Sequence, residues 1–158
     1  MRNRRMRSSR QKGHAMLELA ACASVLVACL AGTFQFGYTF YVYNQMVTAV
    51  GNGARYAAQR TYRDATAQDI ERGNAAIRNM VVYGDPRPSA DAAPVLPNLQ
   101  PGQVEISWAK TGDRAPTSVG LRVNNYPVNA VFRSFAFSGR PYVEFPYVGR
   151  YAPGEREQ

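Results

Sequence analysis

The chain has 158 residues, of which 46% are hydrophobic, and a formal net charge of +8. Six of its 19 basic residues, and no acidic residue, lie in the first thirteen positions, which leaves 13 basic against 11 acidic side chains in the remainder. A nucleic-acid-binding domain would carry its basic residues on the folded part, with aromatic residues among them, so this distribution argues against DNA or RNA as a partner.

An uncharged apolar stretch follows the basic tail. Residues 19–54 contain no Asp, Glu, Lys or Arg, and about 20 apolar residues are enough to cross the hydrocarbon core of a bilayer. Aromatic residues gather roughly 30 Å along the helix from Ala15, where the second membrane interface would fall: Phe34, Phe36, Tyr38, Phe40, Tyr41 and Tyr43. The sequence therefore predicts a transmembrane helix that leaves the membrane near residues 36–38 and continues beyond it.

The basic tail sets the expected orientation of this helix. Because cytoplasmic flanks carry the excess of Lys and Arg, the N-terminus is expected in the cytoplasm and the C-terminal domain outside the cytoplasmic membrane. The alternative is a secretory signal peptide, but no cleavage site of the A-x-A type precedes a polar stretch after Leu30. We therefore predict a single-pass membrane protein.

A second helix is expected before the prolines begin. All ten prolines lie in residues 86–153, and a proline inside a helix costs about 3 kcal/mol, so helices should end near Gly84. Thr66 and Asp69 have the spacing of a capping box that would start this second helix. Its apolar face would consist of Ile70, Ile77 and Val81. Residues 85–101 form a Pro-rich connector.

The C-terminal part has the pattern of short strands. Apolar and polar residues alternate in residues 104–108 and again in residues 119–123, and the segment 112–116 between them is turn-like, which predicts a β-hairpin. Apolar groups in residues 132–137 and 142–145 extend a small antiparallel sheet, which we expect to pack on the second helix. The last group is flanked by Pro141 and Pro146, and prolines in such positions are typical of an edge strand. The fold class is therefore α+β.

The junction between tail and helix, KGHAMLEL at residues 12–19, has a small residue and a single acid at a particular spacing. Cleavage after Gly13 would expose an α-amine on His14 and make Glu18 the fifth residue of the shortened chain, which is the spacing of type IV prepilins. This resemblance implies removal of the leader by an aspartic prepilin peptidase and a role for Glu18 in assembly. A carboxylate at the membrane boundary costs about 2 kcal/mol or more unless a charge compensates it. The alternative is that Glu18 is solvated among headgroups and balances the tail.

Three further segments extend this resemblance. They are FGYTFYVYNQMVTAVGNGARYAAQRTY at residues 36–62, AAIRNMVVYGDP at residues 75–86 and PYVEFPYVGRYAPG at residues 141–154. In this order they resemble the TadE-like minor pilins, or pseudopilins, of the tight-adherence (Tad, or Flp) pilus. The resemblance implies a place in the bacterial inner membrane and in the pilus. The implied partners are the cytoplasmic membrane, a prepilin peptidase, other pilins and the inner-membrane pilus platform.

Two alternatives share this topology: an uncleaved, membrane-anchored scaffold for pilus assembly, and a tip subunit whose outer domain adheres to a surface. The domain organisation is the same in each case. Residues 1–13 are the basic leader, residues 14–63 are the transmembrane helix with its extramembrane extension, and residues 64–158 are the extracytoplasmic α+β domain.

Small residues form a ridge along the transmembrane helix. They recur at every fourth position, at Ala20, Ser24, Ala28 and Gly32. Such a ridge lets a second helix approach closely in lipid, so it is a candidate packing face, although alanine-rich helices also produce such ridges by chance. Further along, Gly51-Asn52-Gly53 lacks the preceding strand and following lysine of a phosphate loop, and we expect a bend or irregularity of the helix there.

The residues needed for catalysis are scarce in the outer domain. The only histidine is His14, and the only cysteines, Cys22 and Cys29, lie in the apolar run and too far apart on one helix to pair. This excludes His- or Cys-based catalytic and metal sites from the outer domain. Its carboxylates are scattered among turns and strands, at Asp85, Asp91, Glu105, Asp113 and Glu144. We therefore expect no catalytic site, no metal, no cofactor and no small-molecule substrate.

Overall fold

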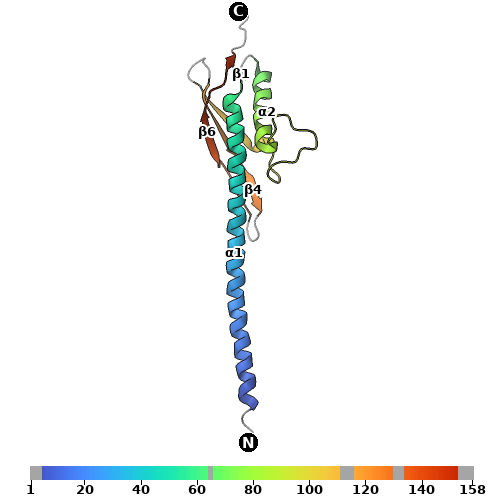
Figure 1. Ribbon diagram of the computed structural model, residues 1–158, viewed down its shortest axis with the longest axis vertical. Coiled ribbons are helices and arrows are strands. Elements are labelled where there is room, and N and C mark those ends of the chain that lie inside the picture. The colour runs from blue at the N-terminus through green and yellow to red at the C-terminus, as the bar shows by residue number, and fades with distance from the viewer. Residues whose placement is uncertain (1–4, 64–65, 111–115, 130–133, 153–158) are drawn as a thin grey trace, which may run out of the picture.

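A computed structural model of the chain describes residues 5–63, 66–110, 116–129 and 134–152. One long helix runs through the molecule, and the rest of the chain folds around its C-terminal part to form a head (Figure 1). The elements, in chain order, are α1 (Arg5–Gln59), β1 (Tyr62–Arg63), α2 (Ala67–Tyr83), the 3-10 helix η1 (Pro101–Gln103), β2 (Val104–Lys110), β3 (Pro116–Val123), β4 (Tyr126–Asn129), β5 (Ser134–Phe137), β6 (Tyr142–Pro146) and β7 (Tyr151–Ala152). The predicted α+β class is confirmed.

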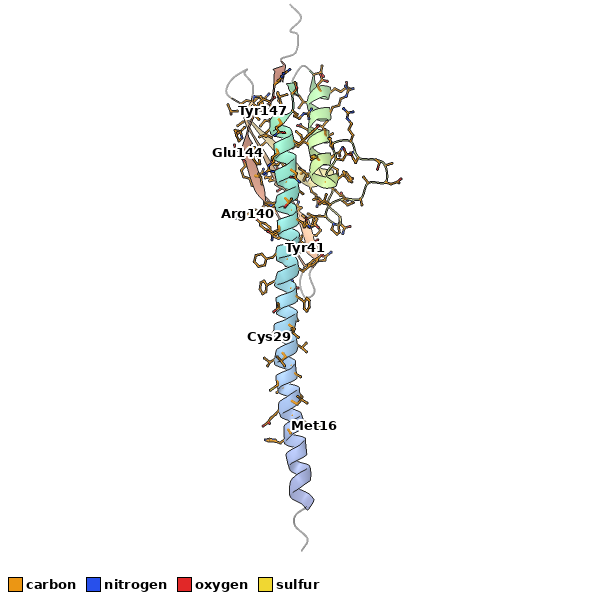
Figure 2. All side chains as sticks on the ribbon, in the orientation of Figure 1. Met16, Cys29, Tyr41, Arg140, Glu144 and Tyr147 are labelled. Carbon is orange, nitrogen blue, oxygen red and sulfur yellow. The ribbon has the colours of Figure 1, made fainter. Side chains whose placement is uncertain are left out.

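The two halves of α1 have different surroundings. Residues 13–41 project from the head as a bare helix, and nearly all of their side chains are exposed (Figure 2). Beyond residue 41, one face of α1 is buried at three- and four-residue spacing, at Val42, Met46, Ala49, Val50, Ala54, Ala57 and Ala58. The same helix therefore serves as a projecting rod and as the central element of the core.

The second helix begins and ends where the sequence predicts. Thr66 is the N-cap of α2, and its hydroxyl oxygen accepts a hydrogen bond from the backbone N–H of Asp69 at 3.1 Å. Gly84 adopts a left-handed conformation with φ 72°, and its N–H donates to the carbonyl of Met80 at 3.1 Å. Ile77 and Val81 are fully buried. The predicted N-cap at Thr66 and the glycine stop are confirmed.

The predicted hairpin is also present. Strands β2 and β3 pair antiparallel with Ile106 opposite Leu121, and β6 joins the other side of β3 with Val143 opposite Leu121. The order β2-β3-β6 makes β6 an edge strand, as its flanking prolines predict. Residues 112–115 of the expected turn lie outside the described residues, and so does Phe132.

The expected packing of this sheet was wrong. Strands β3 and β6 pack mainly against α1, and β2 contacts α2, where the indole N–H of Trp108 donates to Asn74 Oδ1 at 3.4 Å. Within the described residues the strands also form three small sheets instead of one, because β4 pairs there with β5 alone, and β1 pairs in parallel with β7. The extension of α1 beyond the bare segment supplies the apolar face that the sequence interpretation had assigned to α2 alone.

The expected bend at residues 51–53 was also wrong, because α1 continues as a regular helix through this segment. Gly53 is buried, and a Cβ at this position would lie 2.2 Å from Val81 Cγ2 and 3.2 Å from Leu121 Cδ2. A Cβ at Gly51 would meet nothing within 4 Å. Gly53 thus allows α1, α2 and β3 to approach closely.

The C-terminal segment forms hydrogen bonds with the end of α1 and the residues that follow it. The N–H of Val148 donates to the carbonyl of Ala58 at 3.0 Å, and the N–H of Tyr62 donates to the phenolic oxygen of Tyr147 at 2.9 Å. This oxygen lies 2.9 Å from the Arg60 carbonyl and 2.7 Å from the Arg150 carbonyl, and its one proton can go to either. These bonds satisfy backbone groups that the helix end would leave unpaired.

We expect Tyr147→Phe to lower the free energy of unfolding by about 1 kcal/mol. The N–H of Tyr62 keeps the Arg150 carbonyl as an acceptor but loses the phenolic oxygen, and the partly buried Arg60 carbonyl loses the phenolic donor. The measurement is denaturant unfolding in detergent, followed by the fluorescence of Trp108, whose ring centroid lies 6.2 Å from that of Tyr147. Tyr142→Phe is the control, since its hydroxyl donates to the exposed carboxylate of Glu144 and not to the end of α1. Equal losses of stability in the two variants would show that the hydrogen bonds of Tyr147 at the end of α1 add no stability of their own.

Candidate membrane anchor and assembly site

The bare part of α1 has the dimensions of a membrane span. The helix from Gly13 to Gln59 is long and apolar enough to cross a membrane by length and composition. Its large apolar side chains in the projecting part are between 45% and 74% exposed: Met16, Leu17, Leu19, Val25, Leu26, Val27, Leu30, Phe34, Phe36, Tyr38, Phe40 and Tyr41. A continuous apolar surface of this extent needs lipid or protein to cover it.

Serine and threonine hydroxyl groups in this segment are satisfied by the helix itself. Ser24 donates to the carbonyl of Ala20 at 2.8 Å, and Thr33 donates to that of Cys29 at 3.0 Å. An unsatisfied donor in hydrocarbon would cost several kcal/mol, so these internal bonds make the hydroxyls compatible with the interior of a bilayer. The bond of Ser24 also turns its polar atom toward its own backbone, which leaves the small-residue ridge free of polar contacts.

The predicted junction residues lie together on the exposed start of this rod. Gly13, His14 and Glu18 are all exposed, and His14 and Glu18 are one helical turn apart on the same face. A Cβ at Gly13 would meet nothing within 4 Å. Among the residues whose side chains the structure describes, no basic group pairs with Glu18.

The ridge residues line one stripe of α1 below the head. Ala20, Ser24 and Ala28 are exposed, Gly32 is half-buried, and a Cβ at Gly32 would meet nothing within 4 Å. The head therefore leaves this stripe accessible to a second helix. A shallow apolar hollow on the same helix is lined by Ala21, Cys22, Val25 and Leu26.

The carboxylates of the head are held by their neighbours. Arg122 and Asn124 donate to Glu105, and the hydrogen bonds from Arg122 lower the pKa of this carboxyl group. The hydroxyls of Ser118 and then Tyr142 lower the pKa of Glu144 in the same way. Both carboxylates are therefore ionised at neutral pH. Asp113 lies outside the described residues, within which no group of three His, Cys, Asp or Glu side chains could hold a metal ion.

The sequence interpretation missed how much of α1 belongs to the head. The spacing of Val42, Met46, Ala49 and Val50 is that of a buried helical face, and this signal was available in the sequence. It also missed Leu96 and Leu99 in the Pro-rich connector, which are 2% exposed. Their burial follows from the return of the connector along α2, where the N–H of Val95 donates to the carbonyl of Val82 at 2.7 Å.

The fold defines a protein with one apolar helix suited to anchor it in a membrane and a small α+β head at the distal end of that helix. Residues 13–55 match the model of the family described as TadE-like protein. No curated protein and no solved structure matches the chain. The resemblance to the TadE-like family is thus confirmed over residues 13–55, which comprise the projecting apolar helix and much of the buried face of α1. The similarity of residues 75–86 and 141–154 stays a prediction.

Proposed function

We propose that this protein is a minor pilin, or pseudopilin, of a Tad (Flp) pilus. The observation that carries the proposal is that the TadE-like match begins at Gly13 and covers the bare apolar helix with Glu18 near its start. The N-terminus lies in the cytoplasm and the head lies outside the inner membrane, which is the orientation that the basic tail favours. The protein enters or primes the filament together with other pilins and has no catalytic activity of its own.

The proposed assembly step depends on a new charge pair. A prepilin peptidase removes residues 1–13 and frees the α-amine of His14. Glu18 of a neighbouring subunit then faces this amine at the membrane boundary, where an unpaired carboxylate is costly. The exposure of Glu18, without a basic partner among the described side chains, supports a partner outside the chain. The inner-membrane pilus platform would receive the paired subunits.

The test is the fate of the wild-type protein in cells that make pili. Intact mass should show that the membrane and pilus forms lack residues 1–13. A protease added outside spheroplasts should digest the chain beyond Tyr43. Retention of residues 1–13 in piliated cells would favour the uncleaved scaffold, and full protection from the protease would contradict the orientation.

The small-residue ridge makes a separate prediction. Ala28→Leu or Gly32→Leu adds bulk to the ridge without adding polarity, so either change should weaken helix association while membrane insertion persists. Crosslinking to the other pilus components should fall about fivefold, which corresponds to the loss of about 1 kcal/mol of packing. Cys22→Leu is the matched control, because it adds bulk on another side of the helix. Equal crosslinking in ridge and control variants would show that the ridge is incidental.

A further inference from the structure

A groove on the head runs between the end of α1 and α2. It has a volume of about 480 Å³ and a markedly basic lining. We call it the arginine groove and define it by Tyr56, Arg60, Arg72, Ala76 and Arg87. Asp69 is the single acidic residue among the side chains that line it, so the charge of the groove is positive.

The arginines of this groove are only partly engaged within the chain. Arg60 donates from Nη1 to the carbonyl of Gly73, which holds its guanidinium at the wall of the groove. Arg72 lies 4.0 Å from Asp69, and its side chain is 73% exposed. An exposed pair at this distance contributes little, so Arg72 can bind a second carboxylate at small cost.

A carboxylate, opposite in charge to the arginine groove, lies on the other side of α1. Glu144 on β6 accepts hydrogen bonds from the hydroxyls of Ser118 and Tyr142, which are both neutral groups. No basic side chain among the described residues pairs with it. Strand β6 and helix α2 lie on opposite sides of α1 (Figure 1), and Glu144 projects on the side away from α2 (Figure 2).

The carboxylate and the groove also lie at nearly the same level along α1. The guanidinium carbon of Arg55 is 5.8 Å from the ring centroid of Phe145, the neighbour of Glu144 on β6. The groove is lined by Tyr56 of the same helix and by Arg60 directly after its end, so the two levels differ by less than about 8 Å at 1.5 Å per residue. Two copies anchored in one membrane by parallel α1 helices would therefore bring Glu144 of one copy level with the groove of the other.

We propose that the arginine groove binds the Glu144 face of a second copy of this chain standing beside it in the same membrane. The contact joins two different surfaces, so it is heterologous, and such contacts extend into rows instead of closing into a two-fold dimer. The inference rests on the proposed function, because a row of parallel, membrane-anchored copies is what a pilin-like subunit requires. Small side chains at Ala75 and Ala76 leave room for the neighbouring strand.

The test is crosslinking of the full-length protein in liposomes, without other pilus components. In a background with Cys22→Ser and Cys29→Ser, one population carries Ala76→Cys in the groove and the other carries Ala109→Cys on the Glu144 face of the sheet. A short bismaleimide should join position 76 to position 109. The 76–76 and 109–109 products should be at least about tenfold weaker, because a heterologous contact brings unlike surfaces together.

Charge reversal then tests the pairing itself. Arg72→Glu in the first population or Glu144→Arg in the second should each lower the 76–109 product about tenfold, and the two together should restore it to within about twofold of the original. The emission of Trp108 reports whether each variant is folded. A dominant 76–76 product, insensitivity to both reversals, or failure of the double exchange would overturn the inference.

The outcomes separate this inference from the proposed function. If pili contain the processed protein but the 76–109 product is absent in liposomes and in pili, the inference alone falls. If the product forms in liposomes but the protein never enters pili, the contact stands and the minor-pilin proposal falls.

Discussion

Replacing Gly13 with leucine is expected to leave the protein heavier by the mass of residues 1–13 in cells that contain its prepilin peptidase. A peptidase that cuts at this position must admit the backbone closely, and a branched side chain there would obstruct it. The helix tolerates the change, because a Cβ at Gly13 would meet nothing within 4 Å and leucine has a high helix propensity. Processing should fall from nearly complete to undetectable by intact mass.

Two controls isolate the processing step. Gly13→Ala adds only a methyl group and should still be cut to a substantial extent. Glu18→Ala should be cut normally but reduce pilus production, because the amine of His14 on a neighbouring chain loses its proposed partner. Normal piliation by Glu18→Ala would show that this carboxylate is simply solvated. Normal processing of Gly13→Leu would remove the cleavage site from Gly13.

Replacing Gly53 with alanine is expected to lower the free energy of unfolding of the head by about 1–3 kcal/mol, the usual cost of overpacking a well-packed core. The added Cβ would lie 2.2 Å from Val81 Cγ2, a distance at which either the Val81 side chain or the two helices must shift. Denaturant unfolding in detergent, followed by Trp108 fluorescence, measures the loss. The clash outweighs the gain of up to about 1 kcal/mol in helix propensity that alanine has over glycine in a helix interior.

Gly51→Ala is the matched control for this change. Gly51 lies two residues earlier in the same helix, and its added Cβ would meet nothing within 4 Å, so the substitution should stabilise the head. Adding Val81→Ala to Gly53→Ala removes the clashing methyl group and should recover part of the loss. If Gly53→Ala and Gly51→Ala stabilise equally, the close approach of α1 and α2 is not a feature of the folded protein.

Elements defined by local signals were predictable from the sequence. The start of α2 at Thr66 and its end at Gly84 follow from backbone groups that a capping side chain and a left-handed glycine satisfy locally. The pairing of residues 104–108 with residues 119–123 follows from alternation over a short connection. The TadE-like match at residues 13–55 likewise depends on sequence alone.

Contacts between distant segments were not predictable in this way. The closure of α1 by Tyr147 and Val148 joins residues more than 80 positions apart, and nothing local to residues 58–62 identifies them as its partners. The burial of Leu96 within a Pro-rich connector is similar, because composition alone gives such a segment no preferred surface.

The sequence by itself determined that the protein has an apolar helix of membrane-spanning length with Gly13 and Glu18 at its start, because hydropathy, charge and length are properties of consecutive residues. Only the tertiary structure decided that the same helix continues as the centre of the head, that the sheet packs on α1, and that Gly53 is a contact point instead of a bend. Those features depend on which apolar surfaces meet. An apolar face can be buried against any partner of suitable shape, and the choice among partners is made by packing of the whole chain.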